Sequence, residues 1–93
     1  KHGVLGLTKT AAQEYARSGI RVNAICPGTT DTPMMRAFIG GDPGIEKMMK
    51  RTVPTGGLGR PEQVAEAVVW LCWDRASFGN GGPKVVGGGT VCR

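Results

Sequence analysis

The fold is decided by the stretch Gly19-Ile20-Arg21-Val22-Asn23-Ala24-Ile25-Cys26-Pro27-Gly28. Residues 20–26 are short and rich in β-branched side chains, which predicts a strand that the following Pro-Gly pair ends. Before it, residues 3–18 carry apolar side chains at helical spacing, and Gly19 is well placed to end that helix in the left-handed conformation. A helix, a tight turn and a strand make half of a βαβ unit, so the sequence predicts an α/β fold.

After this strand, residues 27–59 predict a long loop with two short helical pieces. Thr32 and Asp42 each precede a proline, which is the pattern of an N-cap followed by proline at the first helical position. Glu46 and Lys50 stand one helical turn apart and can form an ion pair. So long an excursion between regular elements is typical of a lid or a substrate loop.

A second strong helix is predicted over residues 61–74, because Pro61 suits its first turn and Glu62 favours its positive end. Its apolar face is wider than one sheet contact requires, since it comprises Val64, Ala65, Val68, Val69, Trp70, Leu71, Cys72 and Trp73. We expect this helix to be buried on two sides, against a sheet and against either a neighbouring subunit or the rest of a larger chain. A short final strand is expected at about residues 84–87, confined by the proline and the glycines around it.

Composition places the chain among soluble globular proteins. Its 93 residues suffice for at most one small domain, and with 40% hydrophobic and 20% charged residues it is not a fully disordered chain. No apolar run approaches the roughly 18 residues that span a bilayer, and the first residues lack the core of a signal peptide. We therefore expect a cytoplasmic protein without membrane contact. Because the chain does not begin with Met, we expect a fragment whose N-terminal side is missing.

The cysteines and the charges argue against two further classes of site. The three cysteines are odd in number, form no C-x-x-C motif and accompany a single histidine, so we expect neither a disulfide framework nor a metal site; they are Cys26, Cys72 and Cys92. The net charge is +5, but the basic residues are scattered, and only Lys47, Lys50 and Arg51 cluster, with no aromatic platform beside them. We expect no nucleic-acid partner, although a basic module that binds DNA or RNA in a salt-sensitive way remains a third class of interpretation.

Four stretches of the chain, in order, resemble the short-chain dehydrogenase/reductase family. They are Lys1-His2-Gly3-Val4-Leu5-Gly6-Leu7-Thr8-Lys9 with Ala11–Ala16 (the active-site helix, 1–18), Gly19–Gly28 (the sixth strand and its Pro-Gly turn), Asp31-Thr32-Pro33-Met34 (the nicotinamide-contacting loop), and Gly57–Glu62 with Glu66–Leu71 (the next helix and its lead-in). The likeness covers residues 1 to about 78. It implies the C-terminal portion of a doubly wound parallel-sheet, Rossmann-like domain that binds NAD or NADP and assembles as a homo-oligomer, a dimer or tetramer.

In this family the catalytic signature is Y-x-x-x-K, and the resemblance makes Lys1 its lysine. The tyrosine would stand four residues earlier, on the same face of the helix. A lysine ammonium beside a phenol favours the phenolate and lowers the tyrosine pKa from about 10 toward working pH. The tyrosine then exchanges a proton with the substrate oxygen while hydride moves to or from nicotinamide. The lysine would also bond the nicotinamide ribose.

The resemblance places the cofactor around the Pro-Gly turn, at Pro27, Gly28, Thr29, Thr30 and Thr32. A strand that ends in Pro-Gly lets the backbone pass close to a flat ring, and ligands of open α/β sheets lie outside the carboxyl ends of the strands. The backbone around Thr30 would meet the nicotinamide carboxamide, although the family often has Ile or Val there. The Thr32 hydroxyl would bond the carboxamide or a phosphate, and it also suits a plain N-cap.

In the same scheme Met34, Met35 and Phe38 would face the substrate, and flexible apolar side chains there suit a non-ionic alcohol or ketone. Core packing under the loop explains the three residues equally well. A second function class also stays open, a non-catalytic structural or binding subunit of the same fold, and the residue four positions before Lys1 separates the two. The choice between NAD and NADP lies outside the chain, and we expect these 93 residues alone to be inactive.

Overall fold

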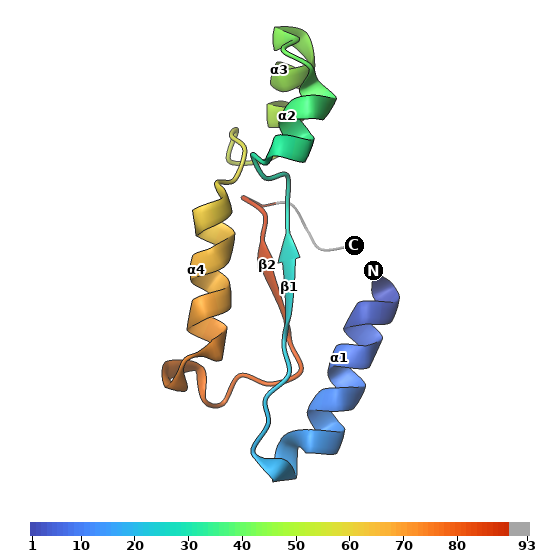
Figure 1. Ribbon diagram of the computed structural model, residues 1–93, viewed down its shortest axis with the longest axis vertical. Coiled ribbons are helices and arrows are strands. Elements are labelled where there is room, and N and C mark those ends of the chain that lie inside the picture. Colours follow the sequence, from blue (N-terminus) through green and yellow to red (C-terminus); the bar gives the residue numbers. More distant parts are fainter. Residues whose placement is uncertain (90–93) are drawn as a thin grey trace.

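The computed structural model describes residues 1–89 and contains four α-helices, two 3₁₀ turns and two strands in that range (Figure 1). Cys92 lies outside the described residues. The elements follow in the order α1 (His2–Tyr15), η1 (Ala16–Ser18), β1 (Ala24–Pro27), α2 (Pro33–Ile39), α3 (Pro43–Arg51), α4 (Pro61–Cys72), η2 (Asp74–Ala76) and β2 (Pro83–Val86).

The two strands form a parallel sheet in which Ala24 pairs with Pro83 and Pro27 with Val86. Parallel strands require a crossover, and α4 lies in that connection. Figure 1 shows the sheet between α4 on one side and α1 on the other. The predicted α/β architecture, with two parallel strands joined by a crossover that contains the second strong helix, is confirmed.

The first strand is shorter than the sequence predicted, because residues 20–23 do not pair with β2. The residues beside them form a turn, where one backbone bond remains, from the Gly81 N–H to Val22 O at 2.8 Å, and side-chain amides make the other bonds. The Val22 N–H donates to Asn80 Oδ1 at 2.9 Å, and Asn23 binds Gly79 O at 2.9 Å and Gly82 N at 3.3 Å. The expected strand over residues 20–26 is therefore corrected to residues 24–27.

Other boundaries shift less. The final strand comprises residues 83–86, whereas residues 84–87 were expected. It can begin at Pro83 because the first residue of a strand can be a proline, which has no N–H to donate. The helix predicted over residues 61–74 ends at Cys72, because Trp73 is extended at φ −91° and ψ 154°. Lys1 is the N-cap of α1, and Gly19 ends the first helical segment at φ 78° as expected.

The two short helices begin as the sequence predicted. Thr32 Oγ1 accepts a hydrogen bond from the Met35 N–H at 3.2 Å, and Asp42 Oδ1 accepts one from the Gly44 N–H at 2.8 Å. Each cap satisfies one of the N–H groups that a helix start leaves without a partner. The two helices pack on each other as a helical hairpin, which Figure 1 shows projecting past the carboxyl ends of the strands.

Little of the chain is buried, and the molecule is elongated, with extents of 51 × 26 × 22 Å. Its radius of gyration is 15.7 Å, whereas a compact domain of this length has about 12 Å. The buried apolar residues are Ala12, Ala24, Ile39, Val53 and Ala76. Large apolar side chains on both long helices are exposed, among them Val4, Leu7, Val69 and Trp70, and so is Trp73 directly after α4. No helix within the described residues is both long and apolar enough to cross a bilayer.

The carboxyl ends of the strands meet where Gly28 follows β1 and Gly87 follows β2. A Cβ on Gly28 would lie 2.6 Å from the Gly87 Cα. Because this is a backbone atom, a change of side-chain rotamer cannot relieve the clash. The Gly28 N–H donates to Val86 O at 3.0 Å across this contact. Glycine at position 28 is therefore required by the neighbouring strand, before any ligand is considered.

We expect Gly28→Ala to lower the free energy of unfolding of the full-length protein by roughly 1–3 kcal/mol, because the new methyl forces two backbones apart. Urea unfolding followed by circular dichroism measures this. Gly57→Ala is the matched control, since a Cβ on Gly57 would meet nothing within 4 Å. Equal stability of the two variants would contradict the steric explanation.

Candidate functional site

The candidate site is built where two segments leave the sheet and reach the helical hairpin. The entry segment, residues 28–32, leads from β1 into α2, and the exit segment, residues 52–60, leads from α3 into α4. The two segments are joined at Gly59, whose N–H donates to Thr29 O at 2.9 Å and whose C=O accepts from the Asp31 N–H at 2.7 Å. The Thr55 N–H donates to Gly88 O at 3.0 Å, which ties the exit segment to the end of β2.

This bridge fixes the direction of the backbone at Thr30. A peptide unit is planar and trans, so its C=O and N–H point in opposite directions. Gly59 holds Thr29 O and the Asp31 N–H, and these belong to the two peptide units that flank Thr30. The N–H and C=O of Thr30 itself therefore point away from Gly59, and within residues 1–89 neither has a hydrogen-bond partner.

The side chains around Thr30 leave this backbone pair open. Thr30 Oγ1 donates to Gly28 O at 3.0 Å, so the hydroxyl turns back toward the end of β1. Thr32 Oγ1 accepts from the Met35 N–H, and its own proton remains available for a further acceptor. A donor and an acceptor on one half-buried residue match a primary carboxamide, which carries one C=O and one NH₂ group. The entry segment thus offers one backbone donor and one backbone acceptor on the same residue.

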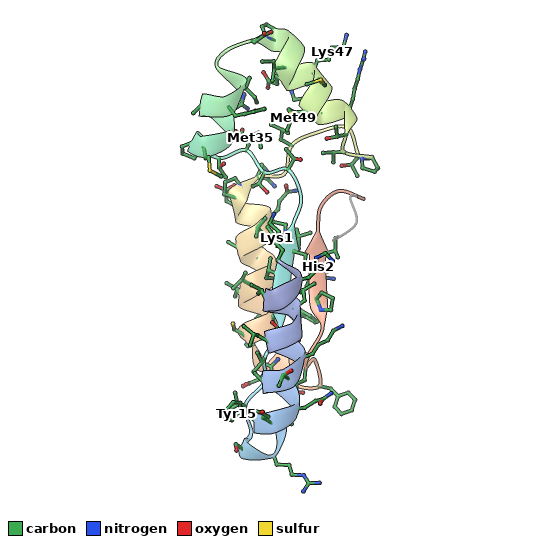
Figure 2. All side chains as sticks on the ribbon, turned by 90° about the vertical axis from the view of Figure 1, so that its right-hand side faces the viewer. Lys1, His2, Tyr15, Met35, Lys47 and Met49 are labelled. Carbon is green, nitrogen blue, oxygen red and sulfur yellow. The ribbon has the colours of Figure 1, made fainter. Side chains whose placement is uncertain are left out.

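Lys1 lies at the start of α1, and its side chain is exposed. Figure 2 shows Lys1 at the end of α1 that is nearer to the helical hairpin and Tyr15 at the opposite end. Tyr15 is the single tyrosine of the sequence. A phenol that works beside Lys1 therefore has to come from outside these 93 residues.

The three residues expected to face the substrate do not share one environment. Met34 and Phe38 stand one turn apart on α2 and are 81% and 66% exposed. Met35 lies between them in the sequence and is half-buried, with its N–H held by the Thr32 cap. The structure thus presents Met34 and Phe38 as one open apolar face and turns Met35 partly inward.

Sequence reasoning missed an ion network at the base of the hairpin. Arg36 Nε and a terminal nitrogen reach the two Asp31 oxygens at 2.6 and 2.8 Å, and its other terminal nitrogen reaches Glu46 Oε1 at 3.1 Å. Lys50 Nζ lies 3.3 Å from the same Glu46 oxygen, as the spacing predicted. Asp31 and Arg36 are five residues apart across a helix start, a spacing that no helical pairing rule covers.

The network lowers the pKa values of both carboxyl groups. The hydrogen bonds from Arg36 hold the pKa of Asp31 below its ordinary 3.8, with help from the nearby charges of Arg36 and Lys50. Hydrogen bonds from Arg36 and then Lys50 lower the pKa of Glu46 below its ordinary 4.5. The carboxylates in turn raise the pKa of Arg36 further above neutrality. Asp31, Glu46 and Arg36 are therefore charged at neutral pH.

A cavity of about 380 Å³ lies beside the bridge, between the exit segment, the start of α4 and the ends of both strands. Thr29 lines it and Thr30 does not, so the unpaired backbone groups of Thr30 lie outside this cavity. Gln63 lines it too, but its Oε1 already accepts from the Arg60 N–H at 2.8 Å. Among the described residues no three His, Cys, Asp or Glu side chains gather as metal ligands would.

The family model described as "Enoyl-(Acyl carrier protein) reductase" matches residues 1–91. The chain is 48% identical to an "A-factor type gamma-butyrolactone 1'-reductase (1S-forming)" of Streptomyces virginiae, covering 96% of this chain and 35% of that protein. It is 46% identical to a "Short-chain dehydrogenase" of Penicillium roqueforti, covering 98% of this chain and 33% of that protein.

A solved structure, "4-hydroxyisoleucine dehydrogenase complexed with NADH", superposes with a TM-score of 0.87 at 31% identity, covering 95% of this chain and 36% of that one. The chain spans about a third of the length of the curated relatives it matches.

We expect the ion network to be insensitive to pH near neutrality and to fail in acid. Both carboxyl pKa values are lowered in the folded state, so their contribution to stability is complete above about pH 5 and is lost as the pH falls below about 4. A carbon NMR titration of the side-chain carboxyls measures this directly. An Asp31 midpoint at or above 3.8, or a midpoint that Arg36→Gln leaves unchanged, would show that the contact does not persist in solution.

Proposed function

The chain belongs to the short-chain dehydrogenase/reductase family, and on that basis we propose that the whole protein is an NAD(P)-dependent oxidoreductase that interconverts an alcohol and a ketone. The observation that carries this proposal is the unpaired N–H and C=O of Thr30 at the carboxyl end of β1. Ligands of open α/β sheets bind outside that end. The NADH named with the superposable dehydrogenase supports the choice of a nicotinamide cofactor.

In the proposed function the entry segment holds the nicotinamide. The N–H and C=O of Thr30 bind the carboxamide. The Thr32 hydroxyl, which accepts a bond from Met35, donates its proton to the carboxamide or to a phosphate. Pro27, Gly28 and Thr29 shape the turn that lets the backbone pass the ring. When bound, this cofactor accepts or supplies hydride. NAD and NADP both satisfy these contacts.

Lys1 supplies the positive charge for proton transfer. We place a tyrosine four residues before it, on the same face of the helix, where the ammonium group favours the phenolate. The phenol then moves a proton to or from the substrate oxygen, and Lys1 also bonds the nicotinamide ribose. The position of Lys1 at the hairpin end of α1 supports this role, and residues 1–93 alone are expected to be inactive without the phenol.

The substrate is proposed to meet the hairpin. Met34 and Phe38 give an exposed apolar face, and the half-buried Met35 adds a flexible side chain behind it. Such a surface favours a non-ionic alcohol or ketone over a charged substrate.

We also propose that α4 contacts a second copy of the protein, so that the cytoplasmic enzyme is a homo-oligomer. Val64, Ala67 and Leu71 are half-buried on the face of α4 that packs on the sheet. Val69, Trp70 and Trp73 are exposed, and Val69 is 62% exposed. An apolar patch that includes two tryptophans is typical of a protein contact.

We expect Lys1→Met in the full-length protein to lower kcat/KM by about 100-fold or more, because the phenol loses the charge that lowers its pKa. Folding should be unchanged, since the Lys1 side chain is exposed. Nucleotide absorbance during turnover measures the rate.

Lys9→Met is the matched control for this experiment, because Lys9 is exposed on the same helix and lies about two turns away. Activity of Lys1→Met equal to that of the control would remove Lys1 from the mechanism. A residue other than tyrosine four positions before Lys1 would instead favour the non-catalytic subunit.

We expect Val69→Asp to shift the full-length protein toward smaller species in sedimentation velocity, because a carboxylate desolvated in an apolar contact is costly. Glu62→Gln changes an exposed residue at the start of the same helix and should leave the assembly unchanged. An unaltered assembly that unfolds more readily would instead place Val69 against another part of the same chain.

A further inference from the structure

We propose that Arg36 is a positioning residue that couples the helical hairpin to the backbone of Thr30, an inference that rests on the proposed function. Its guanidinium binds both oxygens of Asp31, the residue directly after Thr30, and also reaches Glu46 on α3. A single side chain of α2 thereby joins the cofactor-facing segment to both helices of the hairpin.

The coupling works because Asp31 is held at two points. Its N–H donates to Gly59 O at 2.7 Å, and its carboxylate is held by the planar fork of Arg36 at 2.6 and 2.8 Å. The Asp31 N–H and the Thr30 C=O belong to one planar peptide unit. Rotation of the Asp31 backbone would therefore reorient the Thr30 carbonyl. The two hydrogen bonds from Arg36 to the Asp31 carboxylate oppose that rotation.

The network is suited to fixing the orientation of the hairpin and contributes little to the stability of the fold. The side chains of Arg36, Asp31 and Glu46 are 48%, 38% and 29% exposed, and ion pairs with this much access to solvent stabilise proteins only weakly. Among the side chains that the structure describes, every ion pair nevertheless belongs to this network. The hairpin projects past the strands, so loss of the network leaves the sheet intact and frees the hairpin to tilt (Figure 1).

Arginine is required at this position for a geometric reason. The guanidinium presents several N–H groups in one plane, which allows two parallel bonds to Asp31 and a third to Glu46. A lysine ammonium is a point charge and reproduces the attraction without the fixed orientation. Arg36→Lys therefore separates charge from geometry.

The first experiment uses backbone hydrogen exchange and is independent of activity. In the full-length protein, Arg36→Gln should speed exchange at the Asp31 and Gly59 amides, which form the bridge, and across α2. Lys47→Gln is the matched control, because Lys47 is exposed on α3, next to Glu46, and takes no part in the network. Exchange in Arg36→Gln that equals the control would overturn the coupling.

The second experiment is a fluorescence titration with NADH and NADPH, followed by steady-state kinetics. Arg36→Gln and Asp31→Asn should each weaken binding of the nucleotide that the unmodified protein prefers by roughly three- to tenfold. The double variant should bind this nucleotide no more weakly than the single variant with the lower affinity. KM for the nucleotide should rise while kcat changes little. Arg36→Lys should fall between Arg36→Gln and the unmodified protein, and it serves as the second variant if Arg36→Gln folds poorly.

The outcomes separate this inference from the proposed function. An unmodified protein that binds neither nucleotide would overturn the proposed function, and hydrogen exchange would still decide whether Arg36 couples the hairpin to Thr30. Normal nucleotide binding that Arg36→Gln leaves unchanged would overturn the positioning role alone. Additive losses in the double variant would do the same, because they would show that Asp31 and Arg36 act independently.

Discussion

The close approach of two backbones at the carboxyl end of the sheet is the constraint on which the rest of the structure depends. Gly28 and Gly87 have no side chains to hold the chains apart, and the hydrogen bond from Gly28 to Val86 continues the ladder one step past the strands. The next bonds along each segment, from Thr55 to Gly88 and between Gly59 and its two neighbours, can form only because these ends already lie together. The orientation of Thr30 is therefore a consequence of strand packing.

The opposite end of the sheet is closed in a different way. The Arg21 guanidinium donates to three carbonyl oxygens, those of Trp73, Ala76 and Gly79, and so satisfies acceptors that the end of α4 and the turn after it leave exposed. The Asn23 and Asn80 amides complete this closure and shorten β1. Polar groups are thus paired at the amino end of the sheet, whereas at the carboxyl end the N–H and C=O of Thr30 have no partner among the described residues.

The sequence predicted the features that depend on neighbours along the chain. The caps at Thr32 and Asp42 and the Glu46–Lys50 pair follow from local spacing, and the structure has all three. Contacts that depend on the path of the chain through space were not predictable in this way. The bond between Arg36 and Asp31 needs the turn at the start of α2, and the role of Gly28 was assigned to a ligand because its neighbour Gly87 is remote in the sequence. The roles of Lys1 and the substrate-facing residues stay predictions, because they depend on groups outside the chain.

Two kinds of contact hold the hairpin, and they differ in what they allow. Ile39 and Val53 are buried at 2% and 4% exposure, and close packing of this kind admits few alternative arrangements. The side chains of the ion network around Arg36 are partly exposed, and attraction between such charges weakens with salt. Loss of the charge contacts would leave these buried apolar side chains in place, so the tilt of the hairpin could change without unfolding. In the proposed function a substrate enters beside Met34 and Phe38 while the Thr30 backbone is held in place, and a hairpin supported in these two ways would meet both requirements.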